Sequence, residues 1–441
     1  MKFKATLITC FGLLFFVACW SVSFAQQNQY DKATPPQHAA GVSPLGSYTS
    51  VDFGTVNLSN GSLSLKFPIG SVGGRGFQLP LTLNWNSKLW SGSTDTDEDQ
   101  DGSIKTVAFA DFGRSDDFVS FFNRVEPGWT VGFAPTLVAR IVRINFTNLQ
   151  PQGPCYHFTL PKLTLILPDK GEIEFRDDAY DGMPLASDCG GYLSASRGRR
   201  WHATDGSGMI FINDVNDGVA SYNTSGVVIT ADGMRYHFTG ELCDSITDRN
   251  GNQITFHYNG YDVEITDQLG RVTLVQHNVA DPQNPAITLG LLVTLPGYGQ
   301  SRYYKIKGGA MNQHYRSDTS PTLPVITGDY DPLSNGYGWG TATRLFELSY
   351  GRYAQRIDNR SVVTELVLPD NRSVHFRYNE YGEVAEVETP TGGKVWYDYD
   401  YVGDFAAGES PVWETGGDLH TRVFVDRGVL TRRTFPDGVN L

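Results

Sequence analysis

One phrase of this chain is written twice in close succession, and it restricts the folds that are open to the protein. Residues 246–251 read ITDRNG and residues 265–270 read ITDQLG, an offset of 19 residues. Self-similarity at that spacing is typical of stacked supersecondary units. In both copies Asp and Gly supply the residues that a tight turn needs, and a strand with alternating apolar side chains follows. The sequence therefore predicts a series of β-hairpins.

Related phrases occur elsewhere in the chain, from residue 168 onward. They are PDKGEIEF (168–175), TDGSGMIF (204–211), ADGMRYHF (231–238), PDNRSVHFRYN (369–379), TPTGGKVWYDYD (389–400) and FPDGVNL (435–441). In three of the strands the alternating face is aromatic and aliphatic: Met234/Tyr236/Phe238, Ile254/Phe256/Tyr258 and Val374/Phe376/Tyr378. A single hairpin cannot bury such a face, so the hairpins are predicted to stack on one another.

The composition agrees with this prediction and excludes some partners. The chain has 48 Asp and Glu against 35 Lys and Arg, a formal net charge of −13. Nucleic acids and anionic membranes attract basic surfaces, so neither is an expected partner. Glycine (48), Tyr (22), Phe (25) and Trp (8) are plentiful, which favours turns and aromatic strands over helices. The predicted fold class is all-β, an N-terminal β-sandwich-like domain followed by stacked hairpins that form a partial shell.

The first 25 residues have the features of a secretory signal peptide. A short basic start (MKFK) precedes a run of apolar residues, and small residues end the segment at Ala25. Two alternatives stay open: a retained membrane anchor, for which the run is short, and a lipoprotein cleaved before Cys19. The predicted location is outside the cytoplasm, secreted or at the cell surface.

The rest of the chain divides by composition. Residues 26–50 are predicted to be an extended segment, 51–200 a β-rich N-terminal domain and 201–278 a first block of hairpin repeats. Residues 279–345 are rich in Gly, Pro and Asn and are predicted to be an irregular insertion. Residues 346–441 form the second repeat block, which ends in the middle of a repeat. The last strand is expected to expose an edge near Leu441.

The segments 245–275 and 368–400 resemble the repeats of RHS/YD-repeat proteins, and 56–69, 126–135 and 205–211 resemble the β-rich region that precedes such repeats in secreted members. The resemblance implies a shell of spiralling β-hairpins, which in many members encloses a C-terminal toxin domain or displays adhesive surfaces. This chain departs from the family in having few repeats and no DPxGL-like end of the shell, since DPLSNG (331–336) does not match. Autoproteolysis and encapsulation therefore carry over to no residue here.

The sharpest candidate metal site is an acidic loop. Asp97, Asp99 and Asp101 precede a Gly in the order of a calcium loop, and Ser103 would add a backbone carbonyl. The closing bidentate Glu of such a loop is missing, because Ala108 stands there, so Asp95 or Asp111 would have to replace it. A solvated acidic loop is the alternative. No cofactor is expected to be required, and Ca²⁺ is the one candidate.

Other residues that bear on function fall into three groups. Trp339 and Tyr337 stand in a glycine-rich stretch (GYGWG) and are candidates to stack on sugar rings. Cys155 and Cys189 are the nearest pair for a disulfide in the mature chain, with Cys243 as the third cysteine. His237, His257 and His375 are placed on the polar side of their strands, opposite the aromatic faces.

These observations favour a non-enzymatic, secreted structural or cell-surface interaction protein. The sequence has no GxSxG motif, Walker loop or Rossmann fingerprint. The alternatives are a carbohydrate-binding surface protein and, third, a glycosidase-type enzyme that would use an Asp/Glu pair. The expected partners are glycans or a cell-surface protein, and a C-terminal continuation or self-association at the open edge.

Overall fold

The computed structural model describes residues 47–74, 76–98, 104–112, 124–146, 155–182, 197–214, 224–319, 325–326, 342–343, 361–401, 421–424 and 427–438. These residues form 29 strands and one short 3₁₀-helix, Met311–Gln313. The all-β class is therefore confirmed. The predicted signal peptide (1–25) lies outside the described residues, as does nearly all of the predicted extended segment (26–50). The described part contains no helix with the length and apolarity that a membrane span needs.

The N-terminal strands form a six-stranded sheet with the order β1-β2-β3-β4-β8-β7. The strands are β1 (Tyr48–Val51), β2 (Gly54–Asn57), β3 (Leu63–Gly73), β4 (Gln78–Asn86), β7 (Arg124–Glu126) and β8 (Trp129–Gly132). Between β2 and β3, Gly61 has a φ of 65° and the amide of Ser62 donates to Oδ1 of Asn60. The Asn-Gly pair thus forms the turn expected from the sequence.

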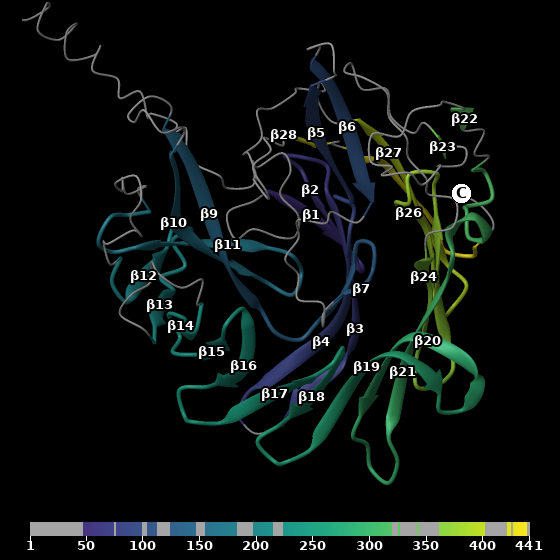
Figure 1. The fold of residues 1–441 in the computed structure, drawn as a ribbon. Helices are drawn as coiled ribbons and strands as arrows, with labels where there is room; N and C mark the ends of the chain where they lie inside the picture. The colour runs from purple at the N-terminus through teal and green to yellow at the C-terminus, as the bar shows by residue number, and fades with distance from the viewer. Residues whose placement is uncertain are drawn as a thin grey trace, which may run out of the picture. The chain divides into compact units, whose positions relative to one another are not determined.

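Most of the remaining strands make one long antiparallel sheet, here called the ladder (Figure 1). Its first half comprises β9 (Thr136–Phe146), β10 (Cys155–Ile166), β11 (Glu172–Asp177), β12 (Arg200–Ala203), β13 (Ile210–Asn213), β14 (Gly226–Ile229), β15 (Arg235–Thr239), β16 (Leu242–Thr247) and β17 (Gln253–Asn259). Its second half comprises β18 (Asp262–Thr266), β19 (Val272–Asp281), β20 (Asn284–Leu295), β21 (Arg302–Ala310), β24 (Ser361–Val367), β25 (Ser373–Tyr378), β26 (Val384–Glu388), β27 (Lys394–Tyr401) and β29 (Arg427–Phe435).

The ladder closes on itself once and then continues. Strands β9 to β16 pair in sequence, and Leu242 of β16 also pairs with Thr136 of β9. This contact makes a closed ring of eight strands. Because β16 pairs with β17 as well, the sheet leaves the ring there and runs on to β29. The remaining strands pair outside the ladder: β28 (Thr421–Phe424), β5 (Trp90–Glu98) and β6 (Ile104–Phe112) in one sheet, and β22 (Val325–Ile326) with β23 (Ala342–Thr343) in another.

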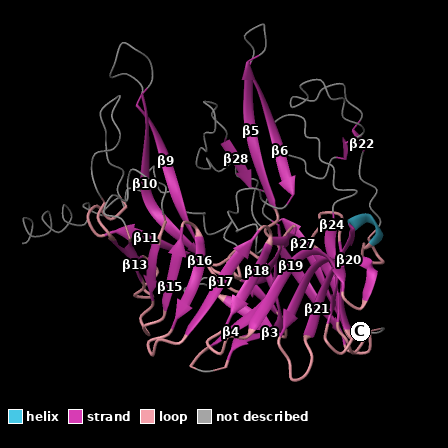
Figure 2. Cartoon of the chain, turned by 60° about the horizontal axis from the view of Figure 1, so that its bottom comes forward, coloured by secondary structure: helices cyan, strands magenta, loops and turns pink. Residues whose placement is uncertain are grey.

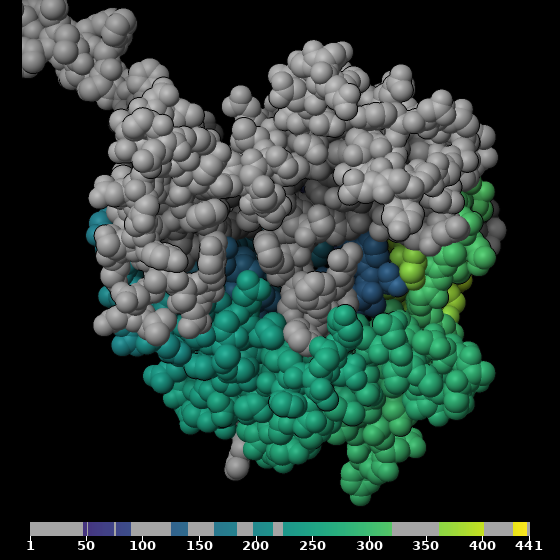
Figure 3. Space-filling view, viewed as in Figure 1, coloured from purple at the N-terminus to yellow at the C-terminus, as the bar shows by residue number. Residues whose placement is uncertain are grey.

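The six-stranded sheet packs against the ladder, and the two share one hydrophobic core. The ring centroids of Trp129 and Phe376 are 4.6 Å apart, those of Phe67 and Phe376 5.1 Å, and those of Phe133 and Phe256 5.8 Å. Figure 2 shows β3 and β4 lying along the ladder strands. In Figure 3 the teal and green ladder forms the described lower surface, and the purple strands β1–β4 are not seen on that face.

The residues predicted to form the N-terminal β-rich domain, 51–200, contribute strands to more than one sheet. Strands β9, β10 and β11 lie within that range, yet they pair with each other and with β12 in the ladder. The first sheet takes its facing layer from the ladder, in part from strands more than two hundred residues away. Strands β3 and β8 carry aromatic and aliphatic side chains on one face, and any sheet with an apolar face can cover them. The sequence therefore did not specify which sheet does so.

Part of the segment predicted to be irregular is regular. Residues 279–310, inside the expected insertion of 279–345, complete β19 and form β20 and β21 in the ladder. Gly and Pro misled the prediction because Pro285 stands next to the first residue of β20, at the end of a strand, where a missing N–H is tolerated. A buried ion pair joins β21 to the end of β19, with Nζ of Lys305 2.8 Å from Oδ1 of Asp281.

Candidate functional site

The ladder is built with one recurring turn. The amide of Asp248 donates to the carbonyl of Asn252 (2.9 Å), and the amide of Gly251 donates back to the carbonyl of Asp248 (3.0 Å). Gly251 has a φ of 85°. These features define a three-residue hairpin loop, a type I turn followed by a left-handed residue. The same pair of bonds recurs in turns that begin at Leu167, Thr230, Asp267, Leu368, Asn379 and Thr389.

The acidic residue that opens two of these turns caps them. One carboxylate oxygen of Asp248 accepts hydrogen bonds from the amides of Asn250 (2.8 Å) and Asn252 (2.9 Å), and the other accepts from the side chain of Asn252 (2.7 Å). Asp267 bonds the amides of Leu269 and Arg271 in the same way. The bonds from Asn252 lower the pKa of Asp248. The repeated Asp of the sequence is therefore a turn cap.

A tyrosine hydroxyl repeats with the turn. The hydroxyl of Tyr258 donates to the carbonyl of Cys243 (2.7 Å) and that of Tyr399 to the carbonyl of Val384 (2.8 Å). Tyr378 donates to Val363 in the same manner. In all three cases the acceptor lies 15 residues earlier, on the preceding strand. The hairpin from acceptor to tyrosine is thus one structural unit that occurs three times.

Removing these hydroxyls should cost a similar amount of stability at each unit. Tyr258→Phe and Tyr399→Phe are each expected to lower the free energy of unfolding by about 1 kcal/mol, because each leaves a carbonyl without its donor. Tyr261, a turn residue that is 65 % exposed, is the matched control, and Tyr261→Phe should leave stability unchanged. Urea denaturation of the three variants measures this. A loss at Tyr261 equal to that at Tyr258 would contradict the structural role of the repeated hydroxyl.

The last strand of the ladder is tied to the first sheet by buried charges. Nε of Arg427 lies 3.1 Å from Oε1 of Glu383, and the two side chains are 6 % and 1 % exposed. Nζ of Lys88 donates to the carbonyls of Asn60 (3.1 Å) and Arg427 (3.2 Å). The Arg427 guanidinium also lies 3.6 Å from the ring centroid of Tyr381. Burial raises the pKa of Glu383, and Arg427 acts in the opposite direction.

The first sheet also reaches the edge of the ladder that was expected to be open. The amide of Val429 in β29 donates to the carbonyl of Gly61 (2.9 Å), and Nη2 of Arg432 lies 2.9 Å from Oδ2 of Asp52. The edge of β29 is therefore covered in part by the loops on either side of β2. The open edge expected near Leu441 itself lies outside the described residues.

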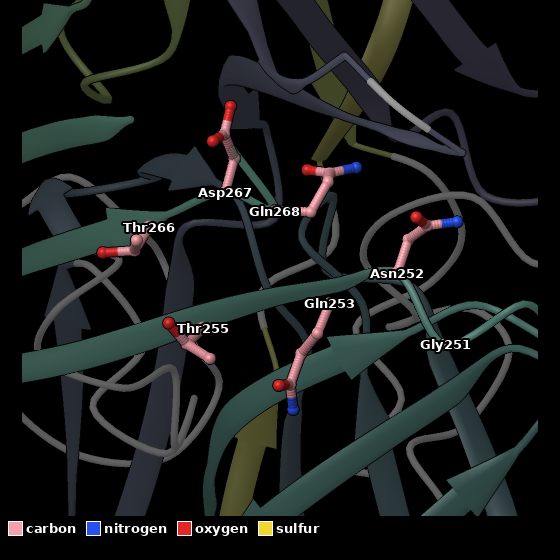
Figure 4. A pocket seen from close by; sticks show the side chains of 7 residues that line it. All are labelled: Gly251, Asn252, Gln253, Thr255, Thr266, Asp267 and Gln268. Atoms are coloured by element: carbon pink, nitrogen blue, oxygen red, sulfur yellow. The ribbon is translucent and has the colours of Figure 1, made fainter. Parts of the chain in front are cut away.

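A polar depression lies on the outer face of the ladder, between two of the recurring turns. It has a volume of about 420 Å³ and is lined by Gly251, Asn252, Gln253, Thr255, Thr266, Asp267 and Gln268. Figure 4 shows that these side chains come from two neighbouring strands and from the turns at their ends. Thr255 of β17 and Thr266 of β18 are cross-strand partners.

The depression holds one carboxylate, and that carboxylate is already neutralised. Nη2 of Arg271 lies 2.6 Å from Oδ2 of Asp267. Burial alone would raise the pKa of Asp267, but the hydrogen bonds from Arg271 and the backbone amides outweigh it, so that the pKa is lowered. Glycosidases of the common type need two carboxylic groups on either side of the scissile bond. The depression does not supply such a pair.

The candidate calcium loop is only partly described. Asp97 lies in β5, where it is the cross-strand partner of Lys105. Asp99, Asp101 and Ser103 lie outside the described residues. The register also bears on the missing ligand: Asp111 pairs with Ser91, six residues along the strand from Asp97, which is about 20 Å at the rise of a β-strand. Asp111 is therefore too distant to close a loop at Asp97.

The histidines lie on the side of the sheet that the alternation predicted. His257 and His375 are exposed, and the residues on either side of each in its strand are buried or half-buried. Each faces an acidic residue on a neighbouring strand, Glu264 for His257 and Glu365 for His375. Nδ1 of His237 lies 2.8 Å from Oδ1 of Asp244. Within the described ranges no group of three or more His, Cys, Asp or Glu side chains is placed to hold a metal ion.

The other candidates have the following positions. Trp339 and Tyr337 lie outside the described residues, and so does Cys189. Cys155 begins β10 and pairs with Phe146 in the register of β9. Cys243 is a free thiol buried in the core, and burial raises its pKa well above the usual range.

Sequence reasoning missed the depression and the buried Glu383–Arg427 pair. The sequence contained a sign of the depression, because the 19-residue repeat gives two similar turns and the strands between them carry hydroxyl residues. It contained no sign of the ion pair, because its members are 44 residues apart and charged residues are common on strand faces. No protein-family model matches the chain, and comparison with curated proteins finds no significant match.

Proposed function

We propose that the chain is a secreted, non-enzymatic structural or cell-surface interaction protein of the RHS/YD-repeat type, in which the ladder forms part of a shell. The observation that carries the proposal is the repeated hairpin unit. Three tyrosines bond carbonyls 15 residues earlier, and the turn of each unit begins five residues after the acceptor. The three tyrosines stand in the segments 245–275 and 368–400, by which the sequence resembles that family.

The packing of the first sheet supports a structural role. Phe67 and Trp129 of the N-terminal sheet pack against Phe376 of β25, and Phe133, directly after β8, packs against Phe256 of β17. Much of the buried apolar surface therefore holds the two layers together. The residues left for interaction are the outer face and the turns. Large apolar side chains are exposed there at Tyr261, Leu269 and Tyr298, and exposed aromatic residues are frequent at binding surfaces.

The location and the size of the native protein test the first half of the proposal. The protein is collected from the medium and from the cell envelope of its source, and its N-terminus and intact mass are measured. We expect a mature N-terminus at Gln26. A mass that matches residues 26–441 would indicate that the native protein is a short repeat protein. A larger mass would indicate that the repeat shell extends beyond Leu441. Recovery of the chain only from the cytoplasm, with Met1 retained, would refute secretion.

Cell binding tests the second half. Fluorescently labelled mature protein is titrated onto intact cells in the presence and absence of excess unlabelled protein. Saturable binding that the unlabelled protein competes away is the expected result. Absence of binding together with turnover of a polysaccharide that a single carboxylate substitution abolishes would replace the proposal with the glycosidase alternative.

A further inference from the structure

The polar depression offers hydrogen-bonding groups that the protein itself leaves unused. The side chains of Gln253, Thr255 and Thr266 make no hydrogen bond to another described residue, although they line one concave site. Each hydroxyl is both a donor and an acceptor, and the amide adds two donors and one acceptor. Since Thr255 and Thr266 are cross-strand partners, their Cβ atoms are about 5 Å apart.

The walls of the site are fixed before any ligand arrives. Asp248 caps the turn on one side and Asp267 caps the turn on the other, each through two backbone amides. Gln268 is tied to the first sheet, because its Nε2 donates to the carbonyl of Phe77 (3.3 Å). A pre-organised site loses little conformational entropy on binding, so even a few hydrogen bonds can contribute useful affinity.

The charge and the surroundings of the site define the ligand class. The one acidic side chain, Asp267, is paired with Arg271 at 2.6 Å, so neither an anion nor a cation finds an uncompensated partner in the lining. Val272 is the cross-strand partner of Thr266 and is 40 % exposed, which places an apolar surface beside the hydroxyls. The hydroxyls of Thr255 and Thr266 and the amide of Gln253 can hydrogen-bond the vicinal hydroxyls of a sugar ring. The apolar surface of Val272 can pack against the C–H face of the ring.

We propose that this depression, built from Gln253, Thr255 and Thr266, binds a neutral carbohydrate. The site is built from residues other than the glycine-rich stretch that holds Trp339, and its assignment does not depend on the RHS/YD-type proposal. Sites of a few hundred Å³ are typical for small ligands, and about 420 Å³ is open to solvent at a sheet face where a longer glycan can pass. The ligand is thus one or two residues of a neutral oligosaccharide.

The test uses the full mature chain and an array of neutral, acidic and sulfated oligosaccharides, followed by calorimetric titration of the best neutral glycan. The double variant Thr255→Val/Thr266→Val removes both hydroxyls, keeps the β-branched shape and should fold normally. We expect its Kd to rise about 25-fold, since each lost hydrogen bond costs about fivefold. Gln253→Ala should weaken binding about fivefold. Thr288→Val, at an exposed position of β20, is the matched control and should bind as the native chain does.

Three results would overturn the proposal. The first is no saturable binding of any neutral glycan by the native chain. The second is preferential binding of acidic or sulfated glycans. The third is binding that is unchanged in the double variant and in Gln253→Ala but is abolished by Trp339→Ala, which would place the carbohydrate site at the glycine-rich stretch instead. Circular dichroism of each variant confirms that a loss of binding is not a loss of folding.

Discussion

Replacing Arg427 with Met should lower the free energy of unfolding at pH 7 by about 3–5 kcal/mol. Arg427 and Glu383 form an ion pair in which both side chains are almost fully buried. Removal of one member leaves the other as a buried charge without its partner, and such losses are among the largest that single substitutions cause. Urea or guanidinium denaturation followed by circular dichroism measures the change. The exposed pair Arg372–Asp370 supplies the control, and Arg372→Met should cost less than about 1 kcal/mol.

The pH dependence of the Arg427→Met variant provides a second check. The pKa of Glu383 in the folded protein is raised by burial above its value in the unfolded chain. The folded state therefore holds this proton more tightly, so stability declines as the pH rises above about 4.5 through the folded pKa. Without Arg427 the folded pKa rises further. The difference in the free energy of unfolding between the native chain and Arg427→Met should accordingly be smaller when denaturation is repeated near pH 5. A difference independent of pH would argue against Glu383 as the buried carboxylate that loses its partner.

Trp129→Ala is the second substitution from which we expect a large effect, about 3–5 kcal/mol. Trp129 is fully buried, lies against Phe376 and donates its indole N–H to the hydroxyl of Tyr378 (3.0 Å). The substitution creates a cavity between the two layers and removes a donor from the core. Tyr298→Ala, at a fully exposed turn residue, should change stability by no more than about 0.5 kcal/mol.

The same variant tests whether the first sheet and the ladder unfold together. Because they share one core, Trp129→Ala should increase hydrogen exchange of the amides in β3 and in β25 to the same degree. Thermal unfolding should remain a single transition at a lower midpoint. Loss of protection confined to β1–β4 and β8, with β25 unaffected, would show instead that the N-terminal sheet is an independent domain, as the sequence had suggested.

The sequence predicted well what depends on neighbouring residues. Apolar side chains at alternate positions placed Ile254 and Phe256 in the core, and the Asp-Gly and Asn-Gly pairs marked turns that the structure contains. Period and turn chemistry are local, since they arise from backbone sterics and from side chains within about five residues. The prediction failed for β20, where Gly and Pro were read as signs of irregular structure although pairing with β19 and β21 holds a strand there.

In the polar depression, too, the sequence predicted the local features but not the long-range pairing. The sequence placed two similar turns 19 residues apart and put hydroxyl residues on the strands between them, so the chemistry of the depression was present in it. It could not show that the turns lie side by side with Thr255 opposite Thr266, because a shift of the register by one residue would send one of them to the other face. The calcium loop remains a prediction at Asp99, Asp101 and Ser103.

By itself the sequence determined that this is an all-β protein of repeated hairpins, with an aromatic inner face, a polar outer face and an acidic turn residue in several units. Only the tertiary structure decided that β16 returns to β9, that the N-terminal sheet covers the inner face, and that Gly61 and Lys88 contact the last strand. The physical reason is that hydrophobic burial is non-directional: an apolar face specifies that it must be covered, whereas long-range pairing and buried charges such as Glu383 and Arg427 select the segment that covers it.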